Sequence, residues 1–173
     1  MKSIYLAGAF CLLLLFLTGC PRSKSAGEVS SSGGPPQVNS SADVVRLGGF
    51  GGGMSQPGSS TLEVPIRIDE GYHVNANPAT FPYLIATEVT TEKVEGIDVG
   101  KPIYPPAVKK KFQFAEEPLA VYEGNVTVTL PLVAHTSGTK TLPISVRVQA
   151  CDQEKCFPPA TLKTTANVNV DAK

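Results

Sequence analysis

The residues best suited to chemistry in this chain are two cysteines, Cys151 and Cys156, with four residues between them. This spacing fits a β-hairpin whose loop, Asp152 to Lys155, brings the two Cα atoms to the roughly 4.4–6.8 Å that a disulfide requires. A thiolate can attack a disulfide sulfur and form a mixed disulfide, so such a pair can also do redox work. The spacing therefore predicts a disulfide hairpin that is either structural or exchange-active.

The residues alone leave both roles of this disulfide open. Most disulfides in secreted domains are structural, but closing a loop of about six residues stabilises a protein by only about 2 kcal/mol. By alternation, Cys151 falls in phase with Ser145 and Arg147 on the polar side of a strand. We therefore expect it at a sheet surface and not in the core, where a tight pair would suit redox exchange better than stabilisation.

Other side chains suggest less chemistry. His73 and His135 are the two histidines, and neither has tight ligand spacing to the cysteines. We therefore predict no metal site and no cofactor, and we expect His73 to be an exposed strand residue. The 15 Lys and Arg residues balance 15 Asp and Glu residues, so bulk electrostatics does not favour a nucleic-acid partner.

The elements that must position the cysteines are β-strands. Charged residues make up only 17% of the chain, while Gly (16) and Pro (15) are plentiful. Apolar and polar residues alternate, with turn signals such as Glu123-Gly124-Asn125 between runs; the alternating runs are 62–68, 126–132, 142–148 and 162–170. This pattern predicts an all-β, immunoglobulin-like antiparallel β-sandwich. Pro65, Pro131 and Pro143 interrupt three of the runs, so we expect those strands at sheet edges or with bulges.

The N-terminus carries the signals of export. A short basic start precedes an apolar run too short for a comfortable membrane span, which predicts a signal peptide over residues 1–19. Leu17-Thr18-Gly19-Cys20 resembles the bacterial lipobox, so Cys20 is the expected site of lipidation. Pro21, in place of Asp, favours the outer membrane. Cys11 leaves with the signal, so Cys151 and Cys156 remain as thiols outside the cytoplasm, where disulfides persist.

The segment between the predicted anchor and the sandwich has the composition of a linker. Ser, Gly and Pro make up 23 of the 40 residues from 21 to 60. Such sequences bury too little apolar surface to order themselves, so we predict a flexible linker over 20–60 and a folded domain over 61–173. An alternative for Val44, Val45 and Leu47 is one additional edge strand.

The sequence around the cysteines resembles the N-terminal periplasmic domain of the thiol:disulfide interchange protein DsbD. The resemblance rests on Val148-Gln149-Ala150-Cys151 and Cys156-Phe157-Pro158-Pro159, and more weakly on Asp69–Val74 and on Tyr122 with Val126–Pro131; it covers about residues 61–170. It implies an immunoglobulin-like sandwich whose cysteines take electrons from a membrane-embedded reductase and pass them to periplasmic thioredoxin-fold proteins. It also implies that Cys156 bonds the partner and that Cys151 resolves the bond.

The same resemblance implies an aromatic cap loop over the cysteines. The matching region is 109–118, where Phe112 or Phe114 would cover the sulfurs. The alternative is that these two residues, spaced by two, belong to one core-facing strand. Three departures from the family stand out: a cysteine spacing shorter by one residue, Val148 in place of an aromatic residue, and no membrane or thioredoxin domain in this chain.

We therefore expect a stand-alone, monomeric, lipid-anchored periplasmic module that performs thiol–disulfide exchange through Cys151 and Cys156. If it is an enzyme, it is a protein-disulfide reductase whose electron donor is another protein. The rival hypothesis is a non-catalytic envelope lipoprotein that binds a protein partner and carries a purely structural disulfide.

Overall fold

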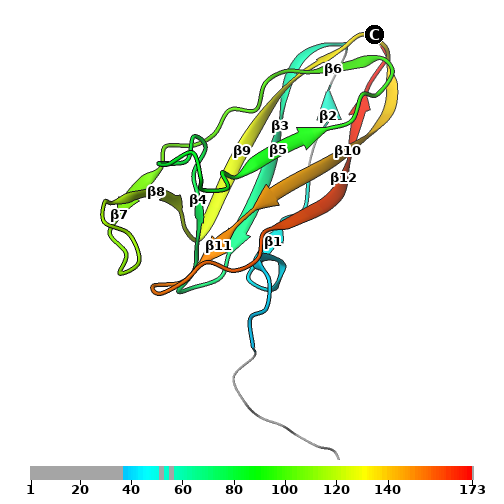
Figure 1. Ribbon diagram of the computed structural model, residues 1–173. Coiled ribbons are helices and arrows are strands. Elements are labelled where there is room, and N and C mark those ends of the chain that lie inside the picture. Colours follow the sequence, from blue (N-terminus) through cyan, green and yellow to red (C-terminus); the bar gives the residue numbers. More distant parts are fainter. Residues whose placement is uncertain (1–36, 51–52, 55–56, 173) are drawn as a thin grey trace, which may run out of the picture. The chain divides into compact units, whose positions relative to one another are not determined.

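The computed structural model describes residues 37–50, 53–54 and 57–172, and within them the chain is almost entirely β-structure (Figure 1). One 3-10 helix, η1, spans Ser41–Asp43. The strands are β1 (Val45–Leu47), β2 (Gly53–Met54), β3 (Gly58–Ile68), β4 (His73–Asn75), β5 (Glu88–Thr91), β6 (Ile97–Val99), β7 (Val108–Lys110), β8 (Leu119–Tyr122), β9 (Asn125–Ala134), β10 (Gly138–Val148), β11 (Ala150–Cys151) and β12 (Ala160–Val170). In this part of the chain, no helix is long and apolar enough to cross a membrane.

The strands form three four-stranded sheets, ordered β1-β3-β9-β6, β2-β12-β10-β5 and β11-β4-β8-β7. The pairs β3–β9 and β10–β12 are long antiparallel ladders of ten and eleven residue pairs. Every pairing is antiparallel except that of β12 with β2. The third sheet lies at one end of the two long ladders, and it contains the cysteine-bearing β11 (Figure 1). The predicted all-β, immunoglobulin-like sandwich is confirmed.

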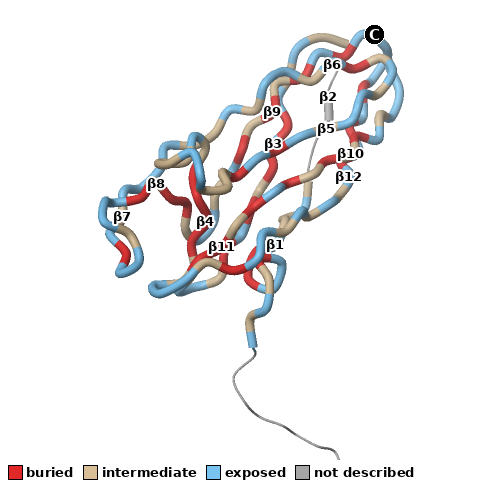
Figure 2. Tube along the Cα trace, viewed as in Figure 1, coloured by how far each residue is buried: buried red, intermediate tan, exposed pale blue. Residues whose placement is uncertain are grey.

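The core follows the alternation in the sequence. Buried and exposed positions alternate along β3, β9, β10 and the second half of β12, as Figure 2 shows. The buried set on β3 consists of Leu62, Val64, Ile66 and Ile68, and that on β10 of Leu142, Ile144, Val146 and Val148. Gly124, with a φ of +64°, lies in the turn between β8 and β9, and Gly138, with a φ of +102°, is the first residue of β10; a side chain would be strained at both positions.

The prolines within the strands do not mark sheet edges, which corrects the sequence-based expectation. Pro65, Pro131 and Pro143 lie on β3, β9 and β10, and each of these strands is internal to its sheet. Each proline instead lies just beyond the last residue that the neighbouring short edge strand pairs with. Its carbonyl still accepts a backbone N–H, so the missing N–H of proline sets where the edge strand stops and not whether a strand forms.

The folded part of the chain begins earlier than residue 61. Val44 and Val45 are buried, and β1 pairs with the end of β3 through Val45↔Ile68. The alternative of an edge strand at this position is therefore correct. A short apolar segment within 20–60 packs on the sandwich, although the composition of that range is typical of a linker. The predicted signal peptide, Cys20 and the first part of the linker lie outside the described residues.

Candidate functional site

The two cysteines form a disulfide across a four-residue hairpin loop, as the spacing predicted. Their Cα atoms lie 3.9 Å apart, closer than the expected range of roughly 4.4–6.8 Å. The N–H of Asp152 donates to the carbonyl of Lys155 at 2.9 Å, and the N–H of Phe157 donates to the carbonyl of Ala150 at 2.8 Å. Within the loop, Oδ1 of Asp152 accepts the N–H groups of Glu154 and Lys155, both at 2.8 Å. Local sequence chemistry therefore builds the hairpin.

Cys151 is buried, which corrects the expectation of a surface position. The alternation of β10 ends at Val148, Gln149 pairs with no strand, and the chain then enters β11 in a different sheet. Both residues of β11, Ala150 and Cys151, have no exposed surface. The interruption at Gln149 breaks the phase on which the prediction rested. Cys156 is partly exposed, so the two sulfur-bearing residues differ in access.

His73 is the residue that the sequence analysis misjudged most. It has no exposed surface, although it was expected to be an exposed strand residue, and it pairs with Cys151 across β4 and β11. Neither ring nitrogen has a hydrogen-bond partner within the described residues. Burial lowers the pKa of His73 from 6.5 to about 4; the Glu123 and Asp152 carboxylates raise it, and Lys110 lowers it further. His73 is therefore a neutral imidazole at neutral pH.

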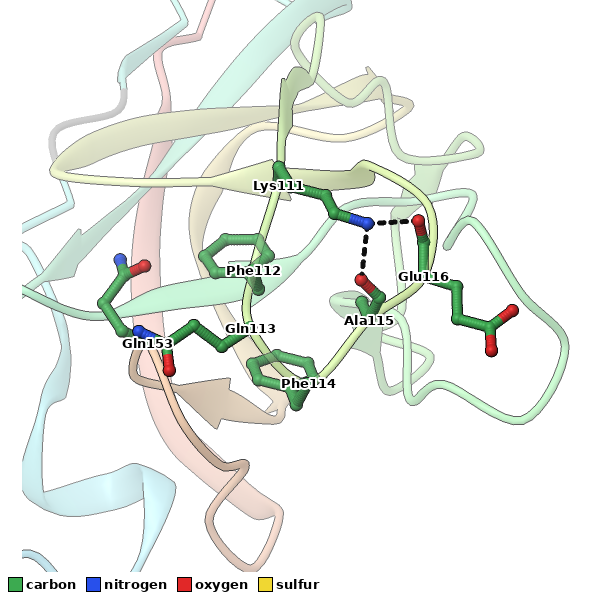
Figure 3. A pocket seen from close by; sticks show the side chains of 7 residues that line it. All are labelled: Lys111, Phe112, Gln113, Phe114, Ala115, Glu116 and Gln153. Atoms are coloured by element: carbon green, nitrogen blue, oxygen red, sulfur yellow. Dashed lines mark hydrogen bonds between the residues drawn. The ribbon is translucent and has the colours of Figure 1, made fainter.

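An aromatic loop covers this histidine. Residues 111–118 join β7 to β8 and are not a strand, so the core-strand alternative for Phe112 and Phe114 is wrong. Phe112 is buried and stacks on His73 with 3.8 Å between ring centroids, whereas Phe114 is 39% exposed and stacks on Phe112 at 5.5 Å. The ammonium of Lys111 closes the loop by donating to the carbonyls of Ala115 and Glu116 (Figure 3).

The aromatic loop and the cysteine hairpin border one shallow depression. Its volume is about 510 Å³, and its lining combines the loop residues from Lys111 to Glu116 with Gln153 of the hairpin. Figure 3 shows the Gln113 side chain between the two phenylalanines, extending towards Gln153. The loop that sequence analysis assigned as a cap is therefore next to the cysteine hairpin.

Ser41, in the 3-10 helix η1, is hydrogen-bonded to both sides of the base of the hairpin. Ser41 in η1 has no exposed surface, and its hydroxyl accepts the N–H of Ala150 at 2.8 Å and donates to the carbonyl of Pro158 at 2.8 Å. Its own N–H donates to the same carbonyl at 3.0 Å. Ser41 therefore connects the residue before Cys151 to the second residue after Cys156. Sequence analysis missed this role because more than a hundred residues separate the partners.

The charged groups at the site are few and mostly paired. Lys110 binds Glu123 at 2.6 Å, and the Lys155 ammonium lies 5.4 Å from the centroid of the Phe157 ring. Partial burial opposes ionisation of Asp152, but the N–H groups of Glu154 and Lys155 and the Lys155 charge hold its pKa below the usual value.

The second histidine, His135, lies away from the cysteine hairpin, and its Nε2 is 2.8 Å from Oδ2 of Asp98. The described residues contain no group of three or more His, Cys, Asp or Glu that could hold a metal ion.

Fold and site together define a class of protein: an immunoglobulin-like sandwich that carries a disulfide hairpin at one end, beside an aromatic loop. Residues 53–167 match the family described as "Thiol:disulfide interchange protein DsbD, N-terminal". This match covers about two thirds of the chain, and the chain belongs to that family. No curated protein sequence matches it.

Solved structures of related domains are similar to this chain at low sequence identity. The N-terminal periplasmic domain of ScsB from Proteus mirabilis is 13% identical, with a TM-score of 0.50 over 74% of this chain and 47% of that one. The reduced DsbD N-terminal domain of Neisseria meningitidis is 18% identical, with a TM-score of 0.47 over 73% and 85% of the two chains. The same Neisseria domain in complex with the PilB N-terminal domain is 18% identical, with a TM-score of 0.42 over 64% and 80%.

Proposed function

We propose that this chain is a periplasmic thiol–disulfide exchange module whose Cys151/Cys156 pair carries electrons from a membrane-embedded thiol reductase to thioredoxin-fold proteins. Membership of the DsbD N-terminal family supports an exchange role and a periplasmic location. The observation that carries the proposal is the cysteine hairpin itself, which sits at one end of the sandwich beside the aromatic loop. A hairpin of this size contributes little to stability, which favours reactivity as its purpose.

The unequal access of the two cysteines supports distinct roles. Cys156 is partly exposed, whereas Cys151 is fully buried. Because thiol–disulfide exchange requires the attacking and attacked sulfurs to meet, the more accessible sulfur suits the bond with a partner. In this proposal Cys156 forms the mixed disulfide and Cys151 resolves it. Phe112 and Phe114 are the cap that restricts access to the pair between encounters.

Trapping of partners in living cells tests the exchange role. A Cys151→Ala protein should accumulate mixed disulfides through Cys156 with thioredoxin-fold proteins or a membrane reductase, because the resolving thiol is gone. A Cys156→Ala protein is the matched control and should trap far fewer. Non-reducing gels with mass spectrometry of the trapped bands give the result. No trapping by either variant, with a reduction potential below about −300 mV, would favour the non-catalytic envelope lipoprotein with a structural disulfide.

The anchor is a second part of the proposal. The lipobox-like Leu17-Thr18-Gly19-Cys20 supports lipidation of Cys20 and attachment to the periplasmic side of a membrane, with the outer membrane favoured by Pro21. Two or more acyl chains hold a protein stably, whereas a single chain binds only marginally. Cys20→Ser should release the protein into the soluble periplasmic fraction or leave the signal uncleaved. A cleaved variant that still fractionates with membranes in high salt would contradict lipidation at Cys20.

A further inference from the structure

The β-ladder places the buried histidine and both cysteines on the same side of one sheet. His73 pairs with Cys151 across β4 and β11, and Cys151 pairs with Cys156 across the hairpin. Residues directly opposite each other on antiparallel strands project to the same side, with Cβ atoms roughly 4.5–5.5 Å apart. The three side chains therefore form a row, with Cys151 between the imidazole and the partly exposed Cys156.

The histidine in this row has an unmet hydrogen-bonding capacity. A neutral imidazole has one N–H donor and one acceptor nitrogen, and neither nitrogen of His73 has a partner among residues 37–50, 53–54 and 57–172 while the cysteines form a disulfide. A buried polar group without a partner is rare in folded proteins and calls for an explanation. Reduction of the disulfide creates a new S–H donor at Cys151, the neighbouring position in the row.

The residues around His73 keep its imidazole neutral and shielded from solvent. Phe112 stacks on the ring and shields it from solvent. The charged groups around it come from three elements: Lys110 ends β7, Glu123 follows β8 and pairs with Lys110, and Asp152 lies in the hairpin. Burial outweighs the pull of the two carboxylates, so the ring carries no charge at neutral pH and can accept a proton.

Cys151 needs such an acceptor more than Cys156 does. The thiolate is the nucleophile in exchange, and a thiol buried in apolar surroundings loses its proton reluctantly. Cys151 has no exposed surface, so water cannot take its proton directly. The nearest basic side chain along the row is the imidazole of His73.

We propose that His73 is the general base of the resolving step, in which its imidazole accepts the proton of the Cys151 thiol as that sulfur attacks the mixed disulfide on Cys156. This inference rests on the proposed exchange function and adds a residue to it.

The S–H bond of Cys151 breaks and its proton passes to His73, while the sulfur electron pair forms the Cys151–Cys156 bond. The bond between Cys156 and the partner breaks, and the partner sulfur leaves with that electron pair as a thiolate. The protonated imidazole then returns the proton to the departing thiolate or to solvent. Two electrons leave the cysteine pair and reduce the partner's disulfide.

Stopped-flow oxidation of the reduced protein by dithiobis-nitrobenzoate tests this role. This aromatic disulfide releases one chromophoric thiolate when Cys156 attacks it and a second when Cys151 resolves the adduct. In His73→Phe, which keeps an aromatic ring against Phe112, the second phase should slow at least about tenfold at pH 7 while the first phase is unchanged. His135→Gln, at the exposed histidine, is the matched control and should leave both phases unchanged.

The pH dependence separates a base from a merely structural residue. The second phase of the wild-type protein should vary little between pH 6 and 8, whereas in His73→Phe it should rise about tenfold per pH unit, because a free thiolate must then form. His73→Gln retains hydrogen-bonding groups without basicity and should be as slow as His73→Phe. Wild-type rates in either variant, or a slowed phase with an unchanged pH slope, would overturn the proposal. Since the probe needs no cellular partner, these results stand apart from the trapping experiment.

Discussion

Acid should destabilise this protein through the buried His73. The pKa of His73 falls from 6.5 to about 4 on folding because burial disfavours the charged ring. Below pH 6.5 the His73 side chain of the unfolded chain therefore binds a proton, whereas that of the folded chain binds one only near pH 4. The free energy of unfolding consequently falls as the pH falls. Linkage gives a loss of about 2 kcal/mol at pH 5 and about 3 kcal/mol at pH 4, relative to pH 8.

Urea melts of oxidised protein from pH 8 to pH 4 measure this effect. Carboxylates also titrate in this range, so the informative quantity is the difference between the wild-type protein and His73→Phe at each pH. The variant should lose about 2 kcal/mol less than the wild type between pH 8 and pH 5. Parallel pH profiles for the wild type and His73→Phe would refute the reasoning, since they would mean that His73 titrates alike in both states.

Three other perturbations have defined outcomes. Reducing the Cys151–Cys156 disulfide should leave a cooperative urea transition and lower the free energy of unfolding by about 2 kcal/mol or less, because the loop is short; a loss of cooperativity would indicate a structural disulfide. Ser41→Ala should cost about 1–3 kcal/mol in a urea melt, because the buried N–H of Ala150 loses its acceptor, and a neutral result would contradict that role. Phe114→Ala should speed alkylation of the reduced cysteines with little loss of stability, since Phe114 is 39% exposed; an unchanged rate would argue against Phe114 as part of the cap.

The parts of the structure that were predictable are those that depend on neighbours in the sequence. Alternation assigned Leu62 to Ile68 and Leu142 to Val148 to the core because side-chain direction in a strand follows from the period alone. The cysteine hairpin followed in the same way, since Asp152 organises its own loop. The family resemblance then implied an aromatic loop beside the cysteines, which no pattern of apolar residues could have indicated.

The parts that were missed depend on contacts between distant segments. The burial of Cys151 depends on a break at Gln149 that moves the chain into another sheet, and nothing in the local alternation marks it. His73, Val74 and Asn75 are all buried, so their short strand shows no period from which burial could be inferred. The ring of His73 is covered by Phe112, some forty residues along the chain, and only the tertiary fold brings them together.

The hydrogen bonds of Ser41 also determine at which end of the sandwich the N-terminal segment is attached. Ser41 lies at the base of the cysteine hairpin, so any pull along the segment that precedes it acts at the hairpin end of the sandwich and not at the opposite end. If Cys20 carries lipid as proposed, nineteen residues lie between it and Ser40, and the contour from one to the other is at most about 70 Å. The hairpin then stays in a thin layer next to the bilayer that holds the anchor, and a donor embedded in that same bilayer would meet it at a high effective concentration. Lengthening this segment should weaken exchange with a membrane partner while leaving exchange with a freely diffusing one unchanged.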